Sequence, residues 1–172
     1  MDEYHDLTKG IIIVGMDSHH QKQVMEYSPY FTDEIKQYLL NEMLVPETEI
    51  VSEADEYGDF IVNQLKPFID SQYRTLTKKQ HTFIAGSSCG GIISIYLGLK
   101  YQNVFSAIGA FSTAYEVEKQ DFLDFVSQTK INPKMRIYHD MGTNEDENLN
   151  AYFVDCHKQF DEILRTKIPE NN

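Results

Sequence analysis

Short runs of β-branched residues alternate with amphipathic stretches along most of this 172-residue sequence. Such alternation is typical of a parallel sheet whose strands are connected by helices that pack against it. The run 11–15 is continuously apolar, as expected of a strand that is buried on both faces. We therefore predict an α/β fold of one domain over residues 1–172: a mostly parallel sheet of four or five strands with helices on both faces.

The other elements follow from the same patterns. In 59–73 the apolar residues share one helical face, and Pro67 predicts a kink because proline lacks a backbone N–H. Residues 48–52 fit a short extra strand. The remaining expected strands are 82–85, 107–111 and 135–140, and the remaining expected helices are 32–43, 90–100, 121–126 and 149–165.

Charge and composition narrow the classes of partner. The 27 acidic and 15 basic residues give a formal net charge of −12, which repels phosphate backbones and anionic lipid. We expect no nucleic-acid partner and no membrane partner, since no apolar run approaches the roughly eighteen residues of a membrane span. The acidic start lacks the basic opening of a secretory signal, so the expected location is the cytoplasm. Cys89 and Cys156 predict two reduced thiols rather than a disulfide framework.

One motif carries chemistry. Residues 86–91 read Gly-Ser-Ser-Cys-Gly-Gly and contain the pattern Gly-x-Ser-x-Gly, directly after an expected strand and at the start of an expected helix. This setting is that of a nucleophile elbow, in which glycines are needed because the turn strains the serine backbone and crowds side chains. Ser88 is then the predicted nucleophile, and the backbone N–H of Cys89 faces an oxyanion on the substrate.

Two other interpretations of the 86–91 turn stay open. It fits a tight strand-to-helix connection without chemistry, and it fits a backbone nest that binds a small anion. The chain would then be a non-catalytic α/β module or a degenerate hydrolase fragment. The Gly-x-Gly-x-x-Gly and Gly-Lys-Ser/Thr patterns that favour a nucleotide are not present.

A serine nucleophile needs a histidine base and a carboxylate that orients the base. The loop after the expected strand 135–140 offers Glu145 and, as a fallback, Asp146. His157 is the one histidine after this loop, but it falls in the middle of an expected helix, where a solvated surface position is the better interpretation. In this type of site the histidine follows the serine and the acid in the chain. Four histidines precede Ser88 and so do not fit this order: His5, His19, His20 and His81. His139 falls within a strand, where core packing is favoured over catalysis.

The sequence resembles the putative-esterase family of α/β-hydrolases, which includes esterase D, siderophore esterases, feruloyl esterases and mycolyltransferases. The matching segments follow one another in order over nearly the whole chain. They are 12–17, 26–29, 60–70, 73–75, 84–91, 97–101, 104–105, 109–112 and 142–145.

The resemblance implies hydrolysis of a small-molecule carboxylic ester through an acyl-enzyme on Ser88, with Glu145 as the acid and no metal or organic cofactor. It also implies a chain that begins at the family's fourth strand and ends before its last. The second oxyanion donor, the histidine loop and the strand between 11–15 and 82–85 would then lie outside the sequence. The expected activity of this chain alone is therefore weak or nil, and no oligomeric state is predicted.

Overall fold

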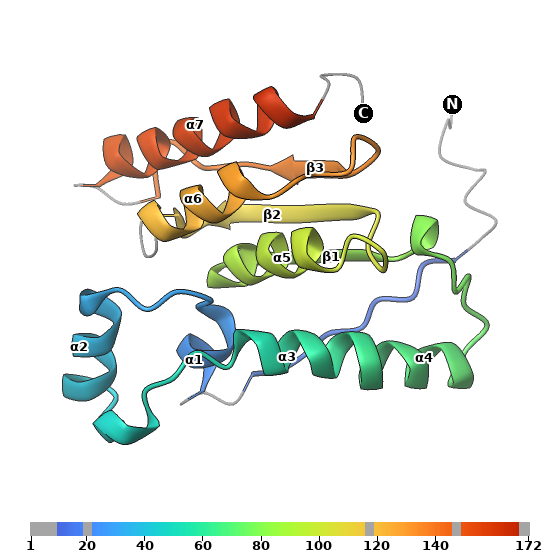
Figure 1. The fold of residues 1–172 in the computed structure, drawn as a ribbon, viewed down its shortest axis with the longest axis horizontal. Coiled ribbons are helices and arrows are strands. Elements are labelled where there is room, and N and C mark those ends of the chain that lie inside the picture. The colour runs from blue at the N-terminus through green and yellow to red at the C-terminus, as the bar shows by residue number, and fades with distance from the viewer. Residues whose placement is uncertain (1–9, 19–21, 116–118, 146–148, 169–172) are drawn as a thin grey trace.

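The computed structural model describes residues 10–18, 22–115, 119–145 and 149–168. Within these residues, helices and strands alternate through the second half of the chain (Figure 1). The elements in chain order are α1 (Gln23–Tyr27), α2 (Asp33–Asn41), η1 (Glu47–Glu49), α3 (Ala54–Phe60), η2 (Ile61–Leu65), α4 (Lys66–Gln72), η3 (Lys79–His81), β1 (Phe83–Ser88), α5 (Cys89–Lys100), β2 (Ala107–Thr113), α6 (Lys119–Gln128), β3 (Arg136–His139) and α7 (Asn150–Lys167).

The described strands form one parallel sheet in the order β1-β2-β3. The predicted α/β fold class is thus present, but the described residues hold three strands rather than four or five. The predicted strand 11–15 is not among them: Ile11 and Ile13 are 77% and 88% exposed, and no strand pairs with them in the described part of the chain. The prediction for 48–52 is also wrong, because Glu47–Glu49 forms a 3₁₀ turn.

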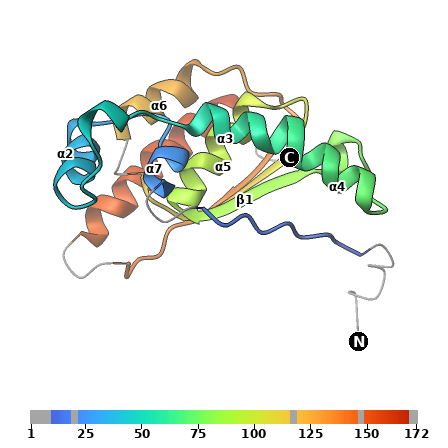
Figure 2. The same cartoon turned by 90° about the horizontal axis from the view of Figure 1, so that it is seen from below.

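The described helices that pack on this sheet cover one face of it. Ile84, Ile108 and Ala110 point to the helices and are buried. Phe83, Phe111 and Tyr138 lie on the other face and are 55%, 43% and 57% exposed. Figure 2 shows α3, α4, α5 and α6 on the same side of β1. The expectation of helices on both faces is therefore wrong for the described residues. The alternation of buried and exposed side chains along the strands shows which face the helices cover.

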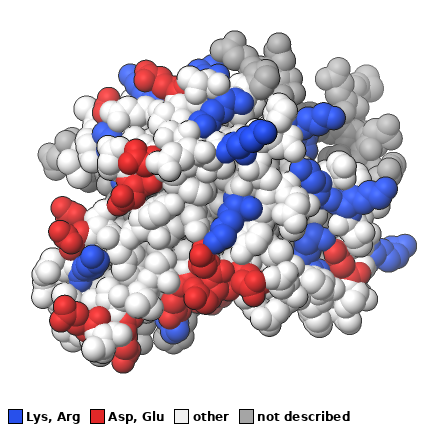
Figure 3. Space-filling model, viewed as in Figure 1, with Lys and Arg blue, Asp and Glu red and all other residues white. Residues whose placement is uncertain are grey.

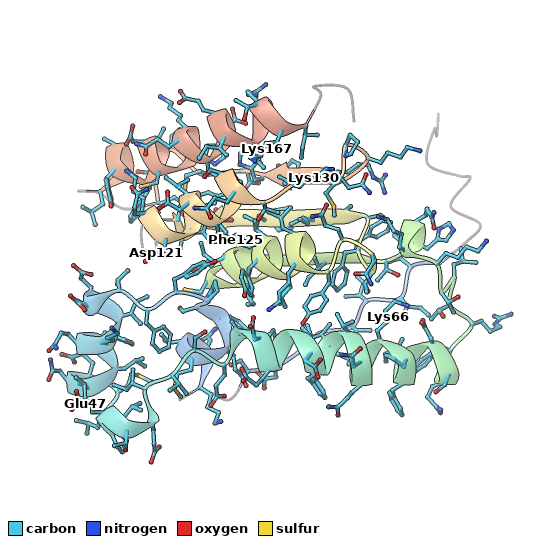
Figure 4. All side chains as sticks on the ribbon, viewed as in Figure 1. Glu47, Lys66, Asp121, Phe125, Lys130 and Lys167 are labelled. Carbon is cyan, nitrogen blue, oxygen red and sulfur yellow. The ribbon has the colours of Figure 1, made fainter. Side chains whose placement is uncertain are left out.

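The core lies between this covered face and the helices. It consists mainly of buried side chains of α5, α6 and α7, each aliphatic one contributing about 1.5–3 kcal/mol through its removal from water. The ring of Phe160 on α7 stacks on Tyr115 with centroids 4.7 Å apart. Phe125 on α6, labelled in Figure 4, packs on Tyr96 of α5 at 5.0 Å. These contacts hold α5, α6 and α7 against the strands that carry the motif residues.

The predicted helix 59–73 begins earlier, at Ala54, and passes through the π-helical segment Ile61–Leu65. The backbone N–H of Lys66 donates to the carbonyl of Ile61, five residues before it. The π turn lies shortly before Pro67, which has no backbone N–H to donate. Lys66, labelled in Figure 4, then donates to Asp70 Oδ2 at 2.6 Å and to the Thr77 carbonyl at 3.2 Å.

Charge is unevenly distributed on the face that carries α5 and α6. Figure 3 shows acidic side chains toward the α2 end of the molecule and basic side chains toward the α4 end. An exposed ion pair joins Lys22 to Glu53 at 2.9 Å, and such pairs contribute about 0–1 kcal/mol.

Over the part of the chain that the structure describes, no helix combines the length and apolar character needed to cross a membrane.

Candidate active site

Ser88 lies at the junction of β1 and α5. The strand continues to Ser88, three residues beyond the expected end, and the helix begins at Cys89, one residue before the expected start. Ser88 has φ 56° and ψ −126°, a backbone conformation that is rare for a residue with a side chain. Such strain costs about 1–3 kcal/mol and persists only where neighbouring contacts impose it. The residue is exposed, and its side chain makes no capping hydrogen bond to α5.

The glycines of the motif explain how this conformation is held. Gly86 and Gly90 pack backbone to backbone, and a Cβ on Gly86 would overlap the carbonyl group of Gly90. A Cβ on Gly91 would overlap the side chain of Thr113 in β2. These close approaches bring the start of α5 against the strands, so the chain must reverse direction at Ser88. The Gly-x-Ser-x-Gly spacing therefore has a steric cause in this structure.

The first turn of α5 provides the polar environment next to Ser88. Cys89 is the first residue of this 12-residue helix. The backbone N–H groups of a first turn point away from the helix body, and the helix dipole places partial positive charge there. An oxyanion formed beside Ser88 would lie in this field, and the donor role of the Cys89 N–H stays a prediction.

Glu145 is held by two hydrogen bonds to the same carboxylate oxygen. Its Oε1 accepts the hydroxyl of Ser112 at 2.8 Å and the backbone N–H of Gly142 at 2.9 Å. A Cβ on Gly142 would overlap the Glu145 carboxylate, so the glycine leaves the space into which the side chain folds back. The carboxylate is thus fixed to the end of β2 and to its own loop, although Glu145 itself is exposed.

Ser88 ends β1 and Glu145 follows β3, so both lie at the carboxyl end of the sheet, with β2 between their strands. Ser88 pairs with Thr113 of β2 after a register shift that leaves Ser112 without a Cα partner in β1, and the Ala114 N–H donates to the Ser88 carbonyl at 3.3 Å. Ser112, which holds Glu145, directly precedes Thr113. This is the edge where parallel α/β sheets carry their sites. The structure thus brings the two residues to one sheet end, while their catalytic roles stay predictions. The fallback acid Asp146 lies outside the described residues.

Sequence reasoning missed Ser112 and Asp140. Ser112 has φ 40°, its N–H donates to Asp140 Oδ1 at 2.8 Å, and Asp140 Oδ2 accepts the Tyr138 hydroxyl at 2.9 Å. The segment 109–112 matched the family pattern, but nothing in it signals a positive φ at a serine. Asp140 was visible only as one acid among several in its loop.

His157 is not the solvated helix residue that the sequence favoured. Its ring lies 4.5 Å from that of His139, centroid to centroid, and 6.0 Å from that of Tyr115. Its Nδ1 is buried and has no hydrogen-bond partner among the described residues. Burial lowers the pKa of His157, although the carboxylates of Asp161 and Asp140 act in the opposite direction. The side chain is therefore part of the contact between α7 and β3.

His139 packs in the core, as predicted for a strand residue. Its side chain is 10% exposed and its Nε2 lies 3.2 Å from Asp161 Oδ1. Burial, followed by the charge of His157, lowers the pKa of His139, while Asp161 partly opposes this shift. His81 lies in η3 before β1, at the amino end of the strand. His5, His19 and His20 lie outside the described residues.

A metal is not assigned to any of these groups. In residues 10–18, 22–115, 119–145 and 149–168, no three His, Cys, Asp or Glu side chains are grouped as ligands of one ion. The chemistry that the described geometry supports is that of a strained, exposed serine beside a helix N-terminus, with an anchored carboxylate at the same sheet end.

Comparison with known proteins places the sequence beside ester hydrolases. A family model described as "Putative esterase" matches residues 4–165. The uncharacterized proteins YbbA and YjcH of Bacillus subtilis (strain 168) are 22% identical over 91% of the chain and 29% identical over 69% of it. An acetyl esterase of Caldicellulosiruptor saccharolyticus is 31% identical over 58% of the chain. These matches cover 60%, 50% and 40% of the three relatives, so the chain spans about half their length.

Proposed function

Because this chain belongs to the putative esterase family, we propose that it provides the nucleophile and the acid of a serine carboxylic-ester hydrolase. Ser88 Oγ attacks the ester carbonyl, the alcohol leaves, and water hydrolyses the resulting acyl-enzyme. The backbone N–H of Cys89 stabilises the oxyanion of each tetrahedral intermediate. Glu145 orients the histidine that takes the proton of Ser88 and returns it to the leaving alcohol.

The backbone of Ser88 carries the proposal. A φ of 56° at a serine between a strand and a helix is costly, and the Gly86–Gly90 contact imposes it. A connection without chemistry would gain stability from glycine at this position. A nucleophile elbow instead needs a side chain there, because its oxygen must stand clear of the sheet.

The general base is not assigned to this chain. His139 and His157 pack against each other between β3 and α7, and both have lowered pKa values through burial. We propose that neither of these two histidines serves as the general base. Losing a triad member costs several orders of magnitude in rate, so we expect little or no esterase activity from the chain alone.

The first test is hydrolysis of p-nitrophenyl acetate by the purified chain, with Ser88→Ala as the control. The short acyl group is chosen because one of the relatives is named an acetyl esterase. Robust turnover that Ser88→Ala abolishes would contradict the missing base, and His157→Ala would then test that residue. Turnover that Ser88→Ala leaves unchanged would not come from the proposed site.

The second test separates the nucleophile from the base. A fluorophosphonate probe, with imidazole supplied as an external base, should modify Ser88, and mass spectrometry should locate the adduct. Ser87→Ala is the matched control, because Ser87 is an exposed neighbour in the same strand and should be dispensable. No adduct on Ser88, or equal labelling of Ser87 and Ser88, would contradict the acyl-enzyme mechanism and favour a non-catalytic turn.

A further inference from the structure

We propose that Ser112 is a positioning residue that fixes the carboxylate of Glu145, and that Asp140 holds Ser112 in the conformation this requires. The inference rests on the proposed function, since Glu145 is the acid of that function. Two acids of one loop then have different roles. Glu145 orients the base, whereas Asp140 holds Ser112, the residue that anchors Glu145.

The hydroxyl of Ser112 joins two parts of the site. It donates to Glu145 Oε1 at 2.8 Å, across 33 positions of the sequence. Ser112 belongs to β2, the strand next to the one that ends in Ser88, and the pairing shifts register here, from Ser87–Phe111 to Ser88–Thr113. The Ser112 hydroxyl therefore ties the loop that carries Glu145 to the strand beside the nucleophile. Hydrogen bonds to a charged acceptor are the stronger ones in proteins.

Ser112 is the residue skipped at the register shift between β1 and β2. Its φ of 40° lies in the left-handed region, which is unfavourable for a residue with a Cβ. Asp140 Oδ1 accepts the Ser112 N–H at 2.8 Å, and the Tyr138 hydroxyl donates to Asp140 Oδ2 at 2.9 Å. Both oxygens of Asp140 thus take part in holding the strand end in this shape, which directs the Ser112 hydroxyl to Glu145.

Glycine at position 112 gives the sharpest test. Ser112→Gly removes the hydroxyl, keeps the N–H that Asp140 accepts, and relieves the positive φ. If Ser112 only stabilised the fold, Ser112→Gly would be either less stable than the parent chain, or equally stable and equally active. A positioning residue should make it at least as stable and less active. Ser112→Asn, which keeps a side-chain donor and tolerates a positive φ, is the rescue variant, and Ser87→Ala is the control.

The assay uses the whole chain with p-nitrophenyl acetate and added imidazole as the base, corrected by Ser88→Ala. For Ser112→Gly and Ser112→Ala we expect kcat to fall about tenfold, the effect of one hydrogen bond to a charged group, with KM unchanged. The imidazole concentration at half-maximal rate should rise, because a misplaced Glu145 no longer orients the base. Ser112→Asn should recover part of the rate. Urea unfolding should show Ser112→Gly to be no less stable than the parent chain.

The outcomes separate this inference from the function on which it rests. Full activity in Ser112→Gly together with loss in Glu145→Gln would overturn the role of Ser112 and leave the esterase function in place. Loss of activity in step with loss of stability would also overturn it, because the effect would then be structural. A parent chain no faster than Ser88→Ala, even with imidazole, would overturn both proposals together.

Discussion

Acidification should weaken the contact between β3 and α7, because two imidazole rings face each other there. The centroids of His139 and His157 are 4.5 Å apart, and Phe160 closes the same space against His139 at 5.2 Å. Asp161 accepts from Arg165 at 2.6 Å and lies 3.2 Å from His139, and the Tyr115 hydroxyl lies 3.5 Å from the other ring nitrogen of His139. Two protonated rings would repel each other in a partly buried place.

The sign follows from the direction of the pKa shifts. Burial lowers the pKa of both histidines in the folded chain below the ordinary 6.5. The unfolded chain therefore binds protons first as the pH falls, so stability is fully present above about pH 7.5 and declines through about pH 5. Each histidine can contribute a slope of at most about 1.4 kcal/mol per pH unit, or about 2.8 kcal/mol per pH unit for the pair.

Asp161 and Asp55 titrate below this window, because the pKa of each carboxylate is lowered. Burial would raise the pKa of Asp161, but its hydrogen bond and ion pair with Arg165, followed by His139, lower it overall. The pKa of Asp55 is lowered by its hydrogen bonds from Lys100 and Tyr96. Carboxylates whose pKa is lowered in the folded chain lose their contribution to stability at a lower pH than the histidines do.

The measurement is the free energy of unfolding in urea, followed by circular dichroism at several pH values between about 7.5 and about 5. His157→Phe, which keeps an aromatic ring beside His139 and Tyr115, should reduce the slope by about half if the two rings contribute equally. His81→Gln is the matched control, since His81 is exposed in η3 and lies away from this contact. An unchanged slope in His157→Phe, or the same loss in His81→Gln, would refute the reasoning.

Two further predictions concern the elbow. Ser88→Gly should raise the free energy of unfolding by up to about 1 kcal/mol, because glycine tolerates φ 56°. The same variant should lose all labelling by a fluorophosphonate. A destabilised variant would contradict the strain at Ser88. Gly86→Ala should lower the free energy of unfolding by about 1–3 kcal/mol and abolish Ser88 labelling, because its Cβ would overlap the Gly90 carbonyl. Gly15→Ala is the control: its Cβ meets open space, so Ser88 should be labelled normally.

The local elements and the elbow could be predicted because their causes lie within a few residues of one another. The pattern of 83–88 followed by 89–100 is an apolar strand, a glycine-rich turn and an apolar helix. Gly86, Ser88 and Gly90 are close in the chain, so their steric demands can be read from spacing. The family match over residues 4–165 agrees with the resemblance that the same segments carried.

Residues far apart in the chain decided the rest. The apolar run 11–14 has the composition of a strand, but a strand forms only where a partner offers its backbone, and none of the described strands pairs with it. The helical pattern of α7 located His157 on a helix, but only the packing of α7 on β3 placed its ring against His139. Likewise, Ser112 gains its partners Asp140 and Glu145 from across 28 and 33 positions. The sequence by itself determined most of the helices, the strands 83–88, 107–113 and 136–139, and the turn at 86–91, whose contacts are short-range. Sheet pairing, the covered face and the anchoring of Glu145 depend on contacts that exist only once the chain has folded.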